Sequence, residues 1–128
     1  MAKSYLDHHN PFKSKAIFNE LLRLLTRKRM YLDPELTAIA MAELLGCSVY
    51  AISAAMRYGT GQNFRTLLAE IRARHAATMM ANPKNDELTL EEISLASGFA
   101  TRQGLHLAFQ RFYNTTPHAY RKALRQSR

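Results

Sequence analysis

Apolar residues recur along this chain at spacings of three and four, and no run of strand length alternates Val, Ile or Thr with polar residues. The pattern predicts an all-α fold with seven helices. The expected helices span about 11–29, 37–46, 48–58, 63–81, 89–98, 101–113 and 117–128.

Residues that favour helix ends stand at the boundaries of these spans. Asn10-Pro11 predicts the first start, because Asn is a good cap and Pro suits the first turn. Thr89 with Glu92 three residues later has the capping-box pattern. Gly59-Thr60-Gly61 predicts a turn, and Asn82-Pro83 predicts a helix end followed by a polar loop over 83–87. The other expected caps are Thr37, Ser48, Asn63, Thr101 and Thr116.

Two parts of the chain repeat one another. Leu36-Thr37 with Gly46 recurs as Leu88-Thr89 with Gly98, and after a one-residue insertion Ile52, Met56, Asn63 and Leu67 match Leu105, Phe109, Thr116 and Tyr120. Each copy has a short helix, a Gly turn, a second short helix and a capped helix beyond, which is the layout of a helix-turn-helix. We therefore expect two helix-turn-helix subdomains joined by a long central helix, in a homeodomain-like arrangement. Two structural helical hairpins are the alternative.

Composition favours a polyanionic partner. The 18 Lys and Arg residues against 10 Asp and Glu give a formal net charge of +8, which suits nucleic acid or an anionic membrane surface. The sequence has no apolar run of spanning length and no leader pattern, so we expect a soluble, cytoplasmic chain.

Residues that could support catalysis or metal binding are sparse. Cys47 is the only cysteine and is expected to be a small buried apolar residue, while His8-His9 has no nearby Cys or second His pair. There is no Gly-rich phosphate loop, nucleophile elbow or carboxylate pair. We expect no metal, no cofactor and no enzymatic activity.

From Tyr31 to Arg121 the sequence resembles the DNA-binding domain of AraC/XylS-type transcriptional regulators. The residues that carry the resemblance are Leu36-Thr37, Ala42, Leu45-Gly46, Ser48, Gly61, Phe64, Arg72, Ala76, Leu88-Thr89, Glu92-Ile93, Gly98-Phe99, Phe109, Thr116-Pro117 and Tyr120-Arg121. The resemblance implies a two-part unit that places the helices after Ser48 and after Ala100 into consecutive major-groove segments of double-stranded DNA. The helix 63–81, about 28 Å long at 1.5 Å per residue, suits the roughly 34 Å between such segments.

The resemblance also implies contact residues. The first recognition helix would present Tyr50, Ser53, Ala54 and Arg57 to bases, and the second Arg102, Gln103, His106 and Gln110. Phosphate contacts are expected from Arg65, Arg111, Arg121 and Lys122. Family members often carry Arg where this chain has Ala54 and Leu107, so two groove contacts are expected to be missing. Asn114 stands where a turn Gly is expected, a position that Asn tolerates.

Charge is distributed unequally between the two copies. The segment 31–82 is balanced, with Arg57, Arg65, Arg72 and Arg74 against Asp33, Glu35, Glu43 and Glu70. The C-terminal segment carries Arg102, Arg111, Arg121, Lys122, Arg125 and Arg128 with no acidic residue among them. We therefore expect the second copy and its tail to dominate non-specific affinity.

These features divide the chain into an N-terminal helix or linker (1–30), a first unit with the linker helix (31–82) and a second unit with a basic tail (83–128). Three roles are open for the N-terminal helix: packing Ile17, Leu21 and Leu24 on the first unit, dimerisation or signal transmission, or lying at a membrane surface. No sensor or dimerisation region is expected within these residues, so either such a region lies elsewhere in a longer protein or the chain is a stand-alone small activator. RNA polymerase would be a partner, and the nucleoid the site of action.

Two other functions compete with sequence-specific DNA binding. The helices could form a protein-interaction or scaffold module whose basic surface is incidental. The chain could also bind nucleic acid without sequence preference.

Overall fold

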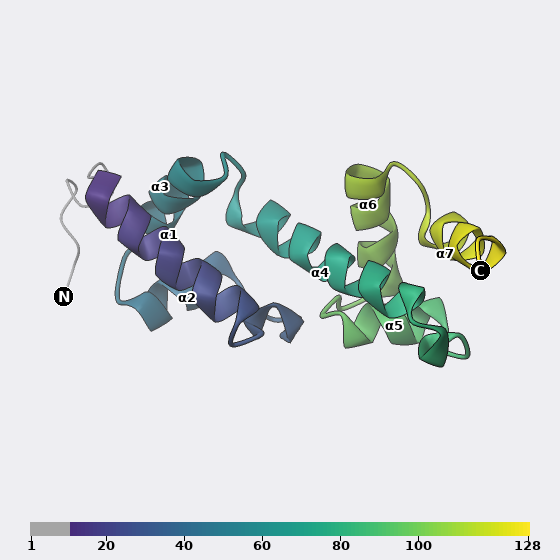
Figure 1. Cartoon of the computed structure of the whole chain (residues 1–128). Helices are drawn as coiled ribbons and strands as arrows, with labels where there is room; N and C mark the ends of the chain where they lie inside the picture. Colours follow the sequence, from purple (N-terminus) through teal and green to yellow (C-terminus); the bar gives the residue numbers. More distant parts are fainter. Residues whose placement is uncertain (1–10) are drawn as a thin grey trace. The chain divides into compact units, whose positions relative to one another are not determined.

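The computed structural model describes residues 11–128, so the predicted cap at Asn10 and the His8-His9 pair lie outside the described residues. Every regular element in this part of the chain is helical, which confirms the all-α prediction with seven α-helices (Figure 1). They are α1 (Pro11–Thr26), α2 (Ala38–Leu45), α3 (Val49–Gly59), α4 (Phe64–Ala81), α5 (Leu90–Ala96), α6 (Arg102–Tyr113) and α7 (Pro117–Gln126). Two 3-10 turns, η2 (Met30–Leu32) and η3 (Pro83–Asn85), lie between them.

Side-chain caps fix where the short helices begin. The Thr37 hydroxyl accepts a hydrogen bond from the Ala40 amide, and the Ser48 hydroxyl accepts one from the Ala51 amide at 3.0 Å. The Thr89–Glu92 capping box forms in both directions, as predicted. The other three caps, Asn63, Thr101 and Thr116, also accept from backbone amides at their helix starts.

Two boundaries differ from the sequence prediction. The first helix ends at Thr26 rather than near Arg29, because Arg29 adopts a left-handed conformation with φ 58°, which a right-handed helix cannot contain. The predicted loop 83–87 begins with the turn η3, because the Asn82 side chain accepts from the Lys84 amide and starts a new helical turn.

The described chain forms two compact units that share α4. Unit 1 contains α1 through Met30 and residues Glu35–Leu68; unit 2 contains Tyr31–Pro34 and Ala69–Arg128. The division therefore falls inside a continuous helix rather than at a loop.

Unit 1 is built around α3. Helix α1 lies against α3 and α2 (Figure 1). Its residues Leu21 and Leu25 are fully buried. Of the three roles considered for the N-terminal helix, packing on the first unit is the one that the contacts support. Gly59 closes α3 where the Phe18 ring leaves no space for a Cβ atom.

Unit 2 has its own core under α6. Its fully buried residues include Met80, Ile93, Leu105 and Phe109, and the Phe109 ring packs on Tyr113 and Tyr120 with ring centres 4.7 and 5.2 Å apart.

The segment Tyr31–Pro34 is fastened to unit 2 by polar contacts. Arg72 donates through Nε to the Tyr31 carbonyl at 2.7 Å and through Nη2 to the Asp33 carbonyl at 2.6 Å. Burial lowers the pKa of Arg72, while the charge of Asp33 acts in the opposite direction. The His75 ring lies 5.6 Å from that of Tyr31, and its Nδ1 is 3.0 Å from the Ser97 hydroxyl.

Two further expectations concern single residues. Asn114 ends α6 in the left-handed region with φ 54°, as the sequence predicted. Cys47 is only half-buried, so the expectation of a buried cysteine is wrong; it follows the exposed Gly46 in the turn between α2 and α3.

Among residues 11–128, no single helix has both the length and the apolar character of a membrane span; α2 and α3 reach them only together, across a bend of 100°. The same residues contain no group of three His, Cys, Asp or Glu side chains that could hold a metal ion.

The two repeated glycines are predicted to respond differently to substitution. Both have positive φ, 65° at Gly46 and 96° at Gly98, but a Cβ at Gly46 would meet nothing within 4 Å, whereas one at Gly98 would collide with the Tyr31 carbonyl. We expect Gly46→Ala to destabilise unit 1 by about 1 kcal/mol, from backbone strain alone. We expect Gly98→Ala to destabilise unit 2 by about 3 kcal/mol, because steric overlap adds to that strain. Urea denaturation would measure the loss of unfolding free energy in each variant, and hydrogen exchange would assign that loss to one of the two units. Equal losses for Gly46→Ala and Gly98→Ala would contradict the proposed role of the Tyr31 contact.

Candidate nucleic-acid interface

The exposed face of α3 carries three of the residues expected to contact bases. Tyr50, Ser53 and Arg57 follow helical spacing, and all are exposed, Tyr50 by 73%. Within the described chain, the side chains of Ser53 and Arg57 make no hydrogen bond, so their polar groups are available to a ligand. The face therefore offers an aromatic ring, a hydroxyl and a guanidinium in a row along one helix.

Ala54 does not belong to this face. It is only 7% exposed and lies with Ala51 and Ala55 on the buried side of α3. The expectation that Ala54 is presented to DNA is therefore wrong. Helices α1 and α2 pack on α3, and Ala54 lies among the buried positions 51, 52 and 54–56 of that helix.

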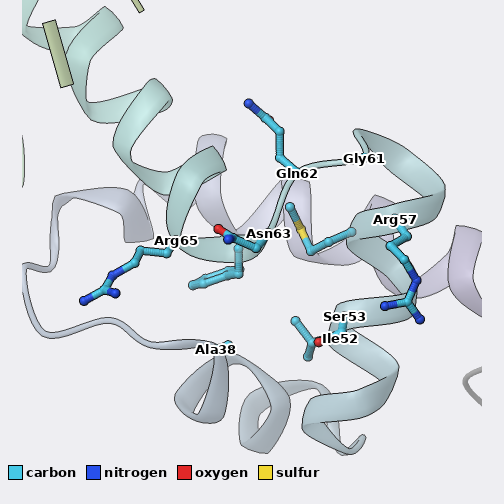
Figure 2. Close-up of a pocket in the computed structure, with 10 residues that line it drawn as sticks. Ala38, Ile52, Ser53, Arg57, Gly61, Gln62, Asn63 and Arg65 are labelled. Carbon is cyan, nitrogen blue, oxygen red and sulfur yellow. The ribbon is translucent and has the colours of Figure 1, made fainter. Parts of the chain in front are cut away.

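A pocket of about 510 Å³ opens next to the α3 face in unit 1 (Figure 2). Ile52, Met56 and Phe64 supply its apolar lining. Polar groups come from α3 and from the start of α4, and Figure 2 shows Arg57 and Arg65 on opposite sides of the opening. The other lining residues are Ala38, Ser53, Gly61, Gln62 and Asn63. The sequence predicts Arg57 and Arg65 as two separate DNA contacts. It does not reveal that the turn at 61–63 brings both residues to one pocket.

The corresponding face of unit 2 lies on α6. Arg102, Gln103 and Gln110 are exposed and His106 is half-buried, and none of the four side chains makes a hydrogen bond to another described residue. The start of the helix is held in place by Ser94, a fully buried residue whose hydroxyl donates to the Thr101 carbonyl at 2.8 Å. The polar groups on α6 therefore make no hydrogen bond within the described chain, and a buried hydrogen bond fixes the start of their helix.

Three of the four predicted phosphate contacts are accessible. Arg65, Arg111 and Lys122 are exposed, and the Arg111 guanidinium lies 5.7 Å from the centre of the Phe112 ring. Because these cationic groups already lie at the surface, they can contact the phosphates of a DNA backbone without rearrangement of the protein.

Arg121, the fourth, is only 8% exposed, and its Nη2 donates to the carbonyls of Asn85 at 2.9 Å and Asp86 at 3.1 Å. Burial lowers its pKa, and the Nε is enclosed without a hydrogen-bond partner. The prediction that Arg121 contacts phosphate is therefore not supported, because its guanidinium is used to hold α7 against the 85–86 turn.

The remaining tail arginines converge on the same turn. Arg125 donates to the Asp86 carbonyl, and Arg128 pairs with the Asp86 carboxylate at 2.6 Å. The hydrogen bond from Arg128, together with the charges of Arg125 and Arg121, lowers the pKa of Asp86. One carboxylate, that of Asp86, thus pairs with part of the C-terminal charge that the sequence assigned to DNA, and Arg102, Arg111 and Lys122 are the exposed cations of this segment that make no bond to the 85–86 turn.

Comparisons with known proteins agree with the helical fold. A family model described as "Helix-turn-helix domain" matches residues 41–123. Over 102 residues the chain is 30% identical to the HTH-type transcriptional regulator GlxA of Rhizobium meliloti (strain 1021). That match covers 80% of this chain and 31% of GlxA, so the chain spans about a third of the length of this relative.

Two solved structures share the fold. The C-terminal domain of AraT, a response regulator from Geobacillus stearothermophilus, is 25% identical with a TM-score of 0.73, and the match covers 84% of each chain. The C-terminal domain of the two-component response regulator yesN from Fusobacterium nucleatum is 24% identical with a TM-score of 0.67, over 83% of this chain and 94% of that one.

The repeated helix-turn-helix units, the family match over most of the chain and these relatives lead to one conclusion. The chain belongs to the AraC-type family of helix-turn-helix DNA-binding transcription regulators.

Proposed function

We propose that this domain reads double-stranded DNA sequence-specifically by placing α3 and α6 in successive segments of the major groove. The observation that carries the proposal is the match between the exposed faces of the two helices. Tyr50, Ser53 and Arg57 of α3 correspond in the internal repeat to Gln103, His106 and Gln110 of α6. Both units thus turn the same positions outward, with donors and acceptors that can reach base edges.

The side chains differ in what they would recognise. Arg57 and Arg102 suit guanine, because a guanidinium can donate two hydrogen bonds to its O6 and N7. Gln103 and Gln110 suit adenine, which offers one donor and one acceptor in the major groove. Ser53 and His106 are less selective, and Tyr50 adds an amphipathic ring at the start of the α3 face.

Phosphate contacts would fix the register of each unit on the duplex. In unit 1, Arg65 stands at the first turn of α4 beside the pocket shared with Arg57. In unit 2, Arg111 at the end of α6 and Lys122 on α7 are exposed and make no bond to the 85–86 turn. Each such contact releases counterions, which makes the affinity dependent on salt.

The chain connection is compatible with two neighbouring half-sites. Helix α4 runs unbroken for 18 residues, about 27 Å at 1.5 Å per residue, and contributes to both units. Successive major-groove segments on one side of a duplex are about 10 bp, or 34 Å, apart. We also propose that the protein acts in the cytoplasm. Contact with RNA polymerase is part of the same proposal, because the proposed role is transcription regulation.

Selection of binding sites from random duplex DNA tests the proposal. We expect an enriched motif with two half-sites about 10 bp apart, one for each unit. Binding without enrichment would indicate a non-specific nucleic-acid binder. Absence of binding at moderate salt would favour a protein-interaction module.

Arg102 is predicted to contribute both affinity and base preference. Replacing it with Ala removes a paired donor from the start of α6, and the loss should be about 1–3 kcal/mol, or roughly 5- to 150-fold in Kd. Repeating the selection with Arg102→Ala should show relaxed preference at one position of the second half-site. An unchanged motif would show that Arg102 does not read a base.

Lys122 and Arg125 form a matched pair that separates phosphate contact from internal structure. Both are exposed cations on α7, but only Arg125 is bonded to Asp86. We expect Lys122→Ala to weaken binding evenly across sequences and to reduce the slope of log Kd against log salt by about one. Arg125→Ala should leave that slope unchanged. Equal slopes for the two variants would contradict the division of the tail described above.

A further inference from the structure

An apolar side chain interrupts the polar face of α6. Leu107 is 55% exposed, although the neighbouring Leu105, Ala108 and Phe109 are all buried in the core of unit 2. It follows Gln103 by four positions and precedes Gln110 by three, so it shares their side of the helix. The side chain is thus placed among groups that are free to bind, and it is not needed to fill the core.

The repeat shows that this placement belongs to unit 2 alone. The corresponding position in unit 1 is Ala54, which is buried, with 7% exposed. A methyl group there cannot extend beyond the surface of α3. Leu107, with its longer side chain, projects from a position where family resemblance leads one to expect Arg.

We infer that Leu107 reads the 5-methyl group of a thymine in the half-site bound by α6. This inference rests on the proposed function, because it requires α6 to lie in the major groove. Of the four bases, only thymine presents an apolar group there, and it does so at the edge that Gln and Arg side chains also contact. An exposed leucine cannot hydrogen-bond to any base, so its favourable contact in this groove is burial of apolar surface against that methyl.

The neighbours of Leu107 place the thymine within the half-site. Gln103 and Gln110 lie on either side of it along the helix, and Gln pairs well with adenine. The base pair that Leu107 contacts therefore lies between or beside the pairs that these two residues contact. The second half-site is expected to be rich in A·T pairs at its centre.

Replacing thymine with uracil tests this inference, because the exchange removes the methyl and leaves every hydrogen-bonding group of the base unchanged. In the site selected from random DNA, each thymine of the second half-site is replaced in turn. We expect one replacement to raise the Kd of the unaltered protein about three- to fivefold, the effect of one buried methyl group. With Leu107→Ala the same replacement should change the Kd by less than about 1.5-fold, because the contacting side chain is gone.

Leu95 provides the matched control. It is also 55% exposed and lies in the same unit, but on α5. Leu95→Ala should keep the full uracil effect, which shows that loss of the effect in Leu107→Ala does not come from removing any exposed leucine.

A second variant changes the base that is read. With Leu107→Arg, repeated selection should replace the thymine by guanine at that position, because Arg prefers guanine O6 and N7. The inference is overturned if no thymine methyl in the second half-site affects binding, or if Leu107→Ala retains the uracil effect. In either case an enriched motif would leave the proposed function standing, whereas failure to enrich any motif would overturn both.

Discussion

Satisfaction of backbone amides at the starts of short helices is the constraint on which this fold depends. Helices of 7 to 12 residues such as α5, α2, α3 and α6 are too short to persist alone in water. A hydroxyl or amide side chain at the residue before each helix accepts the otherwise unpaired amides and decides where the helix begins. In α3 and α6 the caps at Ser48 and Thr101 stabilise the first turn of the helix. Packing of that helix on its unit then decides which residues face outward, and neither cap residue is expected to contact a base.

The positive charge of the domain serves two physically different purposes. Some cationic side chains are exposed and remain hydrated, so that exchanging water for a phosphate costs them little desolvation free energy. They are Arg65, Arg111 and Lys122. Arg72 and Arg121 have given up much of their hydration, and each guanidinium is compensated by carbonyl oxygens of a distant loop. The half-buried Arg72 and the buried Arg121 each cross-link segments about 35 to 40 residues apart in sequence. Part of the formal net charge of +8 therefore lies on side chains whose donors are already used within the domain and cannot bind a phosphate.

Local signals in the sequence predicted the helices well, because caps, turn glycines and apolar periodicity act over a few residues. Thr89–Glu92, Gly46 and Asn114 behave as those signals require. The errors arise where a distant segment decides the outcome. Ala54 is buried through the packing around α3, and Arg121 is drawn inward by the carbonyls of 85–86. Spacing along one helix cannot reveal either contact. The repeat is enough to identify the polar residues of the two exposed faces. The pocket beside α3 could not be predicted in the same way, because it depends on the conformation of the turn at 61–63.

The repeated turn glycines show how equivalent positions of two repeats can be under unlike physical constraints. Gly46 is retained only by its backbone torsion, so residues that tolerate the left-handed region, such as Asn, are open to it. At Gly98, the space that a Cβ atom would need is also occupied by the Tyr31 carbonyl oxygen, the Leu32 Cα and the Arg72 guanidinium. Substitution at the first turn is therefore limited by one backbone torsion, whereas substitution at the second would also displace the Tyr31–Pro34 segment from unit 2. Damage to the second turn would thus reach residues more than 60 positions away in sequence, while damage to the first would stay local.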